Sequence, residues 1–138
     1  MNRNDFKQLS LIRLKEARVL LKKKNYDGAY YLCGYVIECG LKACIAKKTK
    51  RYDFPPDRKT IDEIYTHEPN KLVKAAGLSI ELDGDMKRNK TFADNWGTVK
   101  DWKESSRYEK HTEKDARDLF SAASDKKHGV LQWLKQYW

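Results

Sequence analysis

The sequence predicts an all-α protein: an up-and-down bundle of four to five helices that forms a single domain over residues 1–138. Apolar residues recur with the 3.6-residue period of helices, and no segment shows the sustained apolar–polar alternation of a strand. The chain has only 7 Gly and 3 Pro, so few positions interrupt a helix. The predicted helix at about residues 27–48 is apolar on nearly every side, which is typical of a central, buried helix.

The first two predicted helices form an antiparallel hairpin. Residues 5–23 carry one apolar stripe, formed by Phe6, Leu9, Leu14, Ala17, Leu20 and Leu21. Arg13 falls inside that stripe, so we expect its guanidinium either to reach the edge of the interface or to meet a carboxylate from a neighbouring helix. Residues 22–25 break the pattern, and a short loop there leads into a second helix at about 27–48.

The second helix combines an apolar body with a narrow polar strip. Gly34 and Gly40 allow a neighbouring element to approach closely, despite their cost in helix propensity. Tyr35, Glu38 and Lys42 form the polar strip, and Glu38 precedes Lys42 by four residues, the favourable order for an ion pair.

All three cysteines, Cys33, Cys39 and Cys44, also lie in the second helix. Cys33 and Cys44 share a face but are about three turns apart, beyond the reach of a disulfide. No CxxC pair is present. We therefore expect buried free thiols, with no metal site and no cofactor.

The middle of the chain predicts shorter elements. Residues 49–60 are predicted to form a basic loop that contains Pro55-Pro56. A loop of this length either has a functional role or simply connects two elements at the surface. One or two short helices follow between Thr60 and Gly77; Pro69 suits a helix start and Gly77 a left-handed residue after a helix end. Residues 78–89 are predicted to be a turn-rich connection.

Two helices are predicted in the last third of the chain. Residues 90–104 place Phe92, Trp96, Val99 and Trp102 on one stripe, and residues 105–111 interrupt the pattern. Thr112 then caps a long final helix, with Asp115 in the position of a capping-box carboxylate. The apolar stripe of this helix continues to Trp138.

Charge and the motifs that are missing narrow the function. Lys and Arg number 29 and Asp and Glu 20, which gives a net charge of +9. This balance favours a polyanionic partner such as RNA, DNA or a phosphorylated ligand, although a basic surface also serves solubility alone. No run of 18 apolar residues and no signal peptide is present, so we expect a cytoplasmic protein away from membranes. The sequence lacks P-loop, GxGxxG, HExxH and GxSxG motifs, which argues against NTPase, dehydrogenase, zincin and hydrolase activities.

Three segments resemble motifs of the HEPN domain family, in the order and spacing of that family. Tyr26–Ile45 resembles its apolar helix, with Glu38 followed by Leu-Lys-Ala. Thr66–Leu78 resembles its Thr-His-Asp-Leu stretch, and Trp102–His111 resembles its Ser-Arg-Tyr turn before the final helix. The resemblance spans nearly the whole chain.

The resemblance implies a helical bundle, commonly dimeric, with a role at RNA or nucleotides. Many HEPN domains are endoribonucleases of toxin–antitoxin, abortive-infection or CRISPR-associated systems, and others are non-catalytic nucleotide- or RNA-binding modules. Many small members are encoded beside a minimal nucleotidyltransferase. For this chain the resemblance therefore implies a homodimer, RNA or a nucleotide as ligand, and a nucleotidyltransferase as partner protein.

The resemblance also indicates candidate site residues. The family's metal-independent nuclease motif is Arg, four to six residues and His, whereas Arg107 and His111 are separated by three, and the Arg-Tyr pair resembles a branch without the motif. In such a site Arg107 would stabilise the phosphate and His111 would act as base or acid. For RNA or nucleotide binding the candidates are Arg107, Tyr108, Lys48 and Arg51.

Each candidate also has a structural interpretation. Arg107 is expected to pair with a carboxylate of the second helix, such as Glu38, and His111 to lie exposed in its loop. Glu38 and His67 are expected to be structural polar residues, with His67 hydrogen-bonded within its own turn. The aromatic residues near the C-terminal end either stack on bases or form core and subunit contacts.

Three functional hypotheses follow from these residues and the resemblance. The first is a nucleotide- or RNA-binding module that belongs to a toxin–antitoxin or defence pair. The second is a metal-independent endoribonuclease that acts as a dimer through Arg107 and His111. The third is a non-catalytic module whose basic surface binds an acidic protein.

Overall fold

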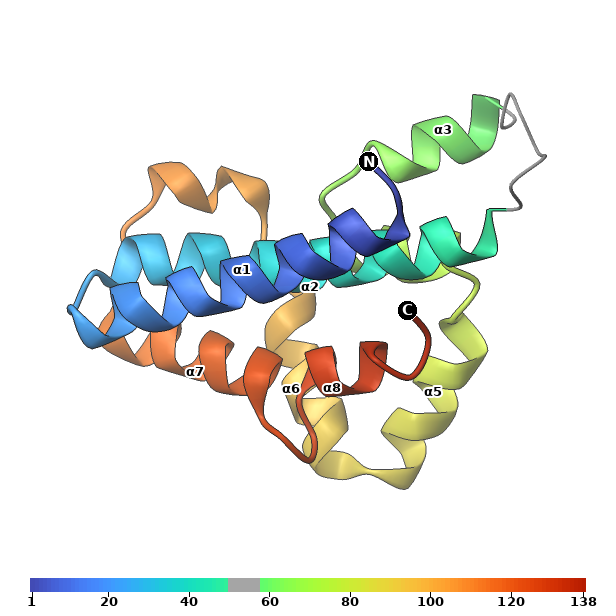
Figure 1. Ribbon diagram of the computed structural model, residues 1–138. Helices are drawn as coiled ribbons and strands as arrows, with labels where there is room; N and C mark the ends of the chain where they lie inside the picture. Colours follow the sequence, from blue (N-terminus) through green and yellow to red (C-terminus); the bar gives the residue numbers. More distant parts are fainter. Residues whose placement is uncertain (50–57) are drawn as a thin grey trace.

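The computed structural model describes residues 1–49 and 58–138. Within these residues it contains α-helices and one 3₁₀ helix but no strand, which confirms the predicted all-α bundle (Figure 1). Arg51 and Pro55-Pro56 of the predicted basic loop lie outside the described residues. The elements are α1 (Arg3–Lys22), α2 (Tyr26–Lys48), α3 (Arg58–Ile64), α4 (Pro69–Ala75), α5 (Ser79–Arg88), α6 (Lys90–Lys100), η1 (Glu104–Tyr108), α7 (Glu113–Ser124) and α8 (Val130–Leu134).

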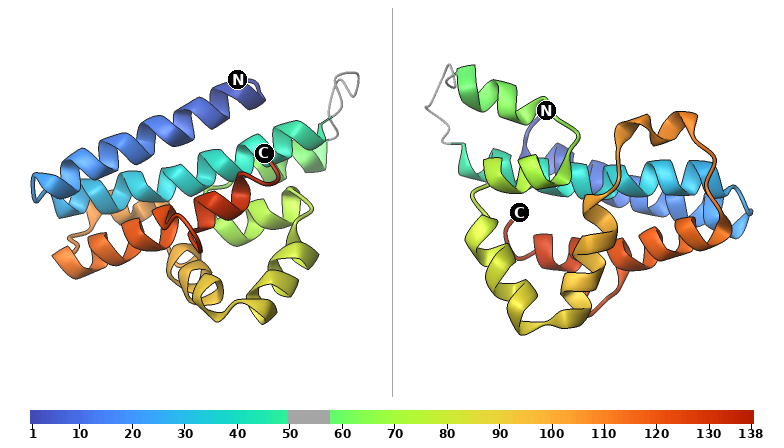
Figure 2. Two further views of the ribbon diagram at one scale, coloured as in Figure 1. Left: turned by 60° about the horizontal axis from the view of Figure 1, so that its bottom comes forward. Right: turned by 180° about the vertical axis from the view of Figure 1, so that it is seen from behind.

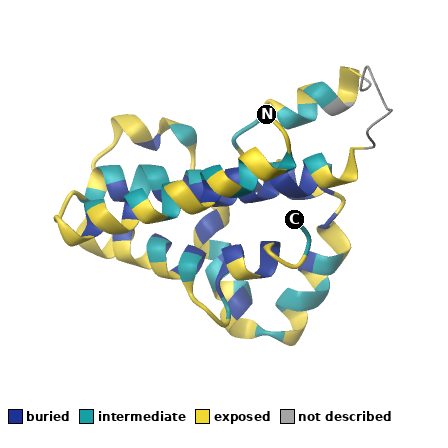
Figure 3. Ribbon diagram, viewed as in Figure 1, coloured by how far each residue is buried: buried dark blue, intermediate teal, exposed yellow. Residues whose placement is uncertain are grey.

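Helix α2 is the centre of the bundle. It packs antiparallel against α1, as predicted, and also contacts α4, α7, α8 and η1. The segment with η1 lies on one side of the α1–α2 hairpin and α7 lies on the other (Figures 1 and 2). Val36, Ile37 and Leu41 are fully buried, and α2 carries most of the buried positions seen along the hairpin (Figure 3). An apolar helix of this kind is stable in water only when other elements cover it.

Helix α2 also has the length and composition of a membrane span. It has no uninterrupted run of 18 apolar residues, but the mean hydropathy of its most apolar window reaches 1.2. In this fold 67% of that window is buried against the rest of the protein. This is the environment of a core helix.

Helix α1 begins and ends at identifiable local signals. The side chain of Asn2 accepts from the backbone N–H of Asp5, and the Asp5 carboxylate accepts from the N–H of Asn2, which completes a capping box. Lys24 adopts a left-handed conformation in the loop to α2. Arg13 pairs with Glu16 of its own helix at 2.6 Å. Of the two roles expected for Arg13, the pairing with a neighbouring helix is therefore wrong.

The three cysteines are free and buried, as predicted. Burial raises the pKa of Cys33 to about 12 and the pKa values of Cys39 and Cys44 to about 11. The thiols therefore stay protonated near neutral pH and act as small core residues.

The segment after α6 approaches α2 closely at Gly34. A Cβ atom at this position would lie 1.9 Å from the indole ring of Trp102, which is 1% exposed. The predicted helix over 90–104 is four residues too long, since α6 ends at Lys100. Because the helix ends before Trp102, the chain can turn there and place the Trp102 ring against Gly34 of α2.

Two other predicted elements differ from the structure. Residues 78–89, predicted as a turn-rich connection, contain α5, because Leu82 is buried and the half-buried Met86 packs on the same core. The long final helix is divided into α7 and α8. Asp125 accepts hydrogen bonds from the backbone N–H groups of Lys127 and His128, and a Cβ at Gly129 would meet the Asp125 carbonyl oxygen at 2.4 Å. This turn ends α7, whose predicted capping box at Thr112 is confirmed.

The contact between Gly34 and Trp102 gives a test of the packing. We expect Gly34→Ala to lower the free energy of unfolding by about 1–3 kcal/mol, because the added methyl group overpacks the interface with Trp102. Gly97→Ala in α6 is the matched control, since a Cβ there meets no atom within 4 Å. It should raise the same free energy by about 0.5–1 kcal/mol through helix propensity. Urea denaturation followed by circular dichroism measures the free energy of unfolding of both variants. Equal effects of the two substitutions would contradict close packing of Trp102 on Gly34.

Candidate functional site

The polar strip of α2 meets a cluster of charged side chains from two later segments. Glu38 is 4% exposed, and both of its carboxylate oxygens have partners. Oε1 accepts from Lys42 Nζ at 2.7 Å, as predicted for this spacing, and Oε2 lies 2.9 Å from Nδ1 of His67. A buried carboxylate requires such partners because desolvation without them is costly.

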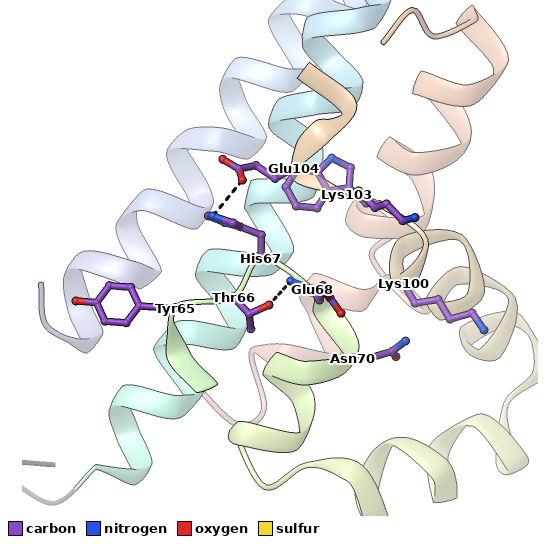
Figure 4. A pocket seen from close by; sticks show the side chains of 9 residues that line it. Tyr65, Thr66, His67, Glu68, Asn70, Lys100, Lys103 and Glu104 are labelled. Carbon is purple, nitrogen blue, oxygen red and sulfur yellow. Dashed lines mark hydrogen bonds and ion pairs between the residues drawn. The ribbon is translucent and has the colours of Figure 1, made fainter. Parts of the chain in front are cut away.

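His67 joins α2 to η1. Its Nε2 atom lies 3.3 Å from Oε2 of Glu104 (Figure 4). With Glu38 at Nδ1, both ring nitrogens face carboxylates. Both contacts are hydrogen bonds only when each nitrogen carries a proton. The prediction that His67 hydrogen-bonds within its own turn is wrong, because its partners come from α2 and η1. The interpretation of Glu38 and His67 as structural polar residues agrees with these contacts.

Glu104 is also bound through its other oxygen. Oε1 accepts from Tyr35 at 3.4 Å and from Arg107 at 3.2 Å, and the hydroxyl groups of Tyr31 and Tyr35 are 3.1 Å apart. Burial, the hydrogen bond with Tyr31 and the nearby carboxylates raise the pKa of Tyr35. The phenol therefore remains a hydrogen-bond donor. We call Glu38, Lys42, His67 and Glu104 the His67 cluster.

A cavity of about 480 Å³ opens beside the His67 cluster. Its wall includes the half-exposed ring of His67, with Tyr65, Asn70, Lys100 and Lys103 around it (Figure 4). The acidic residues at the cavity already have partners, since Glu68 pairs with Lys71 and Glu104 with His67 and Arg107. Neither Lys100 nor Lys103 forms an ion pair within the described part of the chain. The uncompensated charge at this cavity is therefore positive.

The structure places Arg107 and Tyr108 on the surface of η1. Arg107 pairs with Glu104 rather than with Glu38, so the expected pairing with the second helix is wrong. Its guanidinium also lies 4.7 Å from the centre of the Tyr108 ring, which is 80% exposed. A hydrogen bond with Tyr31 and the neighbouring Tyr108 and Glu104 raise the pKa of Arg107.

His111 lies in a different environment. Its ring stacks on Tyr30 with centroids 3.7 Å apart, and its backbone N–H donates to the Asp27 carboxylate. Its side chain is only 9% exposed, so the prediction of an exposed loop histidine is wrong. Within the described residues no hydrogen bond or ion pair connects His111 to Arg107, and the two side chains contact different residues of α2.

Of the remaining predicted candidates for binding, Lys48 does not line the cavity. The Lys48 ammonium lies beside Gly77, whose φ of 71° confirms the predicted left-handed residue after α4. Arg51 is outside the described residues. Of the aromatic residues, the indole rings of Trp96, Trp102 and Trp133 are core groups.

Sequence reasoning missed several residues of the site. Glu104 completes the His67 cluster, and Tyr65, Lys100 and Lys103 line the cavity. The polar strip on α2 was the available signal, because a buried face with three polar residues needs polar partners from elsewhere. The strip alone does not indicate which segments supply them.

By its fold and site, the protein is a small helical bundle. A charged cluster, the His67 cluster, joins its central helix to two connecting segments. The sequence model of the HEPN domain matches residues 5–137, so the chain belongs to the HEPN domain family. Neither the curated proteins nor the solved structures contain a match to the chain. Membership supports a general role at nucleotides or RNA.

The burial of Glu38 predicts a large effect of its removal. Glu38→Ala should lower the free energy of unfolding by about 1–3 kcal/mol, because it leaves Lys42 Nζ and His67 Nδ1 without their hydrogen-bond partner on α2. The control is Glu68→Ala, which removes an exposed ion pair with Lys71 and should cost less than about 1 kcal/mol. Chemical denaturation compares the two variants. A Glu38 effect no larger than that of Glu68 would show that the His67 cluster does not hold the bundle together.

Proposed function

We propose that this HEPN-family chain is a cytoplasmic module that binds single-stranded RNA or nucleotides through the 480 Å³ cavity beside the His67 cluster. The observation that carries the proposal is the pair of lysines, Lys100 and Lys103, that face this cavity without an ion-pair partner among the described residues. Phosphate groups supply the negative charge that these ammonium groups lack.

The other residues of the cavity suit the same ligand. Asn70 offers an amide to a phosphate or a base edge, and the 81% exposed ring of Tyr65 offers a face on which a base stacks. Arg107 and Tyr108 extend the basic and aromatic surface along η1. The His67 cluster fixes η1 relative to α4 and so holds the two sides of the cavity at a constant separation.

Catalysis by Arg107 and His111 remains the second hypothesis. Within one chain the two side chains have separate partners, so a composite site would need residues from two subunits. The homodimer that the family resemblance implies would provide them. The binding module has the stronger support, because its cavity is complete within one chain.

The proposal includes a partner protein. A minimal nucleotidyltransferase would form a toxin–antitoxin or defence pair with this chain, as for many small members of the family. The first test is the neighbouring gene, which the proposal expects to encode a minimal nucleotidyltransferase. Co-expression of that gene product with the chain, followed by size-exclusion chromatography with light scattering, tests both the pair and the homodimer. Separate elution of the two proteins would contradict the pair.

Removing the two cavity lysines tests the RNA site. The double variant Lys100→Ala, Lys103→Ala should weaken binding of a fluorescent single-stranded RNA and lower the slope of log K against log salt by about 1.4. The matched control removes two exposed lysines elsewhere, Lys126→Ala and Lys135→Ala. Fluorescence anisotropy over a range of salt concentrations measures both. Equal losses would indicate non-specific attraction to a basic protein and contradict the cavity.

The same RNA, incubated with the protein and EDTA and separated on a gel, tests the second hypothesis. A binding module leaves the RNA intact. Cleavage that is lost in His111→Ala would instead support the metal-independent nuclease. Cleavage that is unchanged in this variant would indicate a contaminating nuclease.

A further inference from the structure

A second cavity, of about 560 Å³, lies between the start of α2, α6 and the start of α7. No lysine or arginine lines it, although the chain as a whole carries a net charge of +9. Four aspartates line it together with two aromatic rings: Asp94, Asp101, Asp115, Asp118, Tyr30 and His111. This acidic cavity is distinct from the basic cavity beside the His67 cluster.

The aspartates are only partly compensated. Asp118 pairs with Lys114, Asp94 lies 3.5 Å from Lys90, and Asp101 has no ion pair within the described residues. Asp115 accepts from the backbone N–H of Thr112 in the capping box. Burial and then the carboxylates of Asp115, Glu109 and Asp101 raise the pKa of Tyr30, which shows that the rings lie in a negative field.

His111 carries a second, independent signal. Its side chain is nine-tenths buried, it lines the acidic cavity, and its Nε2 atom is buried without a hydrogen-bond partner in the described chain. The one carboxylate oxygen within 4 Å in the described chain, Oε2 of Glu109, is 3.9 Å away, too far for a hydrogen bond. Buried polar atoms in folded proteins are rarely left without a partner.

Gly97 lies at an open part of the wall of the acidic cavity. It lies in the interior of α6, where glycine costs helix stability, and a Cβ there would meet no atom within 4 Å. Close packing therefore does not explain why this position lacks a side chain. The consequence of glycine at this position is free space in the cavity wall.

We propose that the acidic cavity binds an organic cation, a guanidinium or alkylammonium group, over the stacked rings of Tyr30 and His111. Such groups pair with carboxylates and with aromatic faces. Their several N–H donors reach carboxylates that are far apart, whereas within the described residues no group of three His, Cys, Asp or Glu side chains is placed to hold a metal ion. The cation belongs either to an arginine or lysine side chain of a protein partner or to a free polyamine.

Nuclear magnetic resonance titration of the ¹⁵N-labelled full chain tests the proposal. Three probes are added separately: N-acetyl-arginine methylamide, spermidine and MgCl₂. The amide signals of Gly97 and Thr98 should shift saturably with at least one organic cation and not with MgCl₂. Tighter binding of the arginine derivative indicates a protein side chain, and tighter binding of spermidine indicates a free polyamine.

Three variants make the result specific. Gly97→Met fills the open space and should abolish the saturable shifts, while Asp101→Asn should raise the dissociation constant about threefold or more. Asp83→Asn removes an exposed carboxylate of α5 away from the acidic cavity and should bind like the unchanged chain. The dispersion of each spectrum verifies folding. If Gly97→Met is unfolded, the comparison of the dissociation constants of Asp101→Asn and Asp83→Asn decides the test.

Absence of saturable shifts with both organic cations would overturn the proposal. Equal shifts with MgCl₂, or unchanged binding in Gly97→Met or Asp101→Asn, would also overturn it. The RNA-binding assay is independent of these outcomes, because its lysines line the other cavity.

Discussion

The buried carboxylate of Glu38 is the constraint on which the arrangement around α2 depends. Among the described residues it is the one charged side chain in the core. Burial of a carboxylate costs several kcal/mol unless hydrogen bonds and opposite charges replace water. Lys42 supplies one partner from the same helix, but His67 comes from the segment between α3 and α4, and His67 in turn contacts Glu104 of η1. Two segments distant in sequence are therefore held against one face of α2.

The same arrangement separates charge on the surface of a basic protein. Lys100 lines the cavity beside the His67 cluster, whereas the next residue, Asp101, lines the acidic cavity. The end of α6 lies between the two cavities, and Trp102 then anchors the chain on Gly34 of α2. Because this anchor is fixed by close packing, the neighbouring lysines and aspartates keep their positions on opposite sides. One helix end thus contributes side chains of opposite charge to two separate cavities.

Much of the bundle could be predicted from local patterns. The apolar periodicity located α1, α2 and α6, Thr112 indicated the start of α7, and Gly77 indicated the end of α4. The site was less predictable. The i,i+4 pair of Glu38 and Lys42 follows from helix geometry, but no spacing rule connects His67 to Glu38 or to Glu104, which belong to other segments. The predicted Arg107–Glu38 pair failed because Arg107 pairs with Glu104, three residues earlier in η1, while Lys42 and His67 occupy the two oxygens of Glu38.

The sequence by itself determined the helical class, the central position of α2 and the excess of positive charge, since periodicity, hydropathy and composition are local properties of the chain. The tertiary structure alone decided which charges remain unpaired, where Asp125 divides the final helix, and that residues 79–88 are helical. These features depend on contacts between distant segments, such as His67 with Glu38 and Asp85 with Trp133. The energy of such contacts exists only after the chain has folded, so no single segment reveals it.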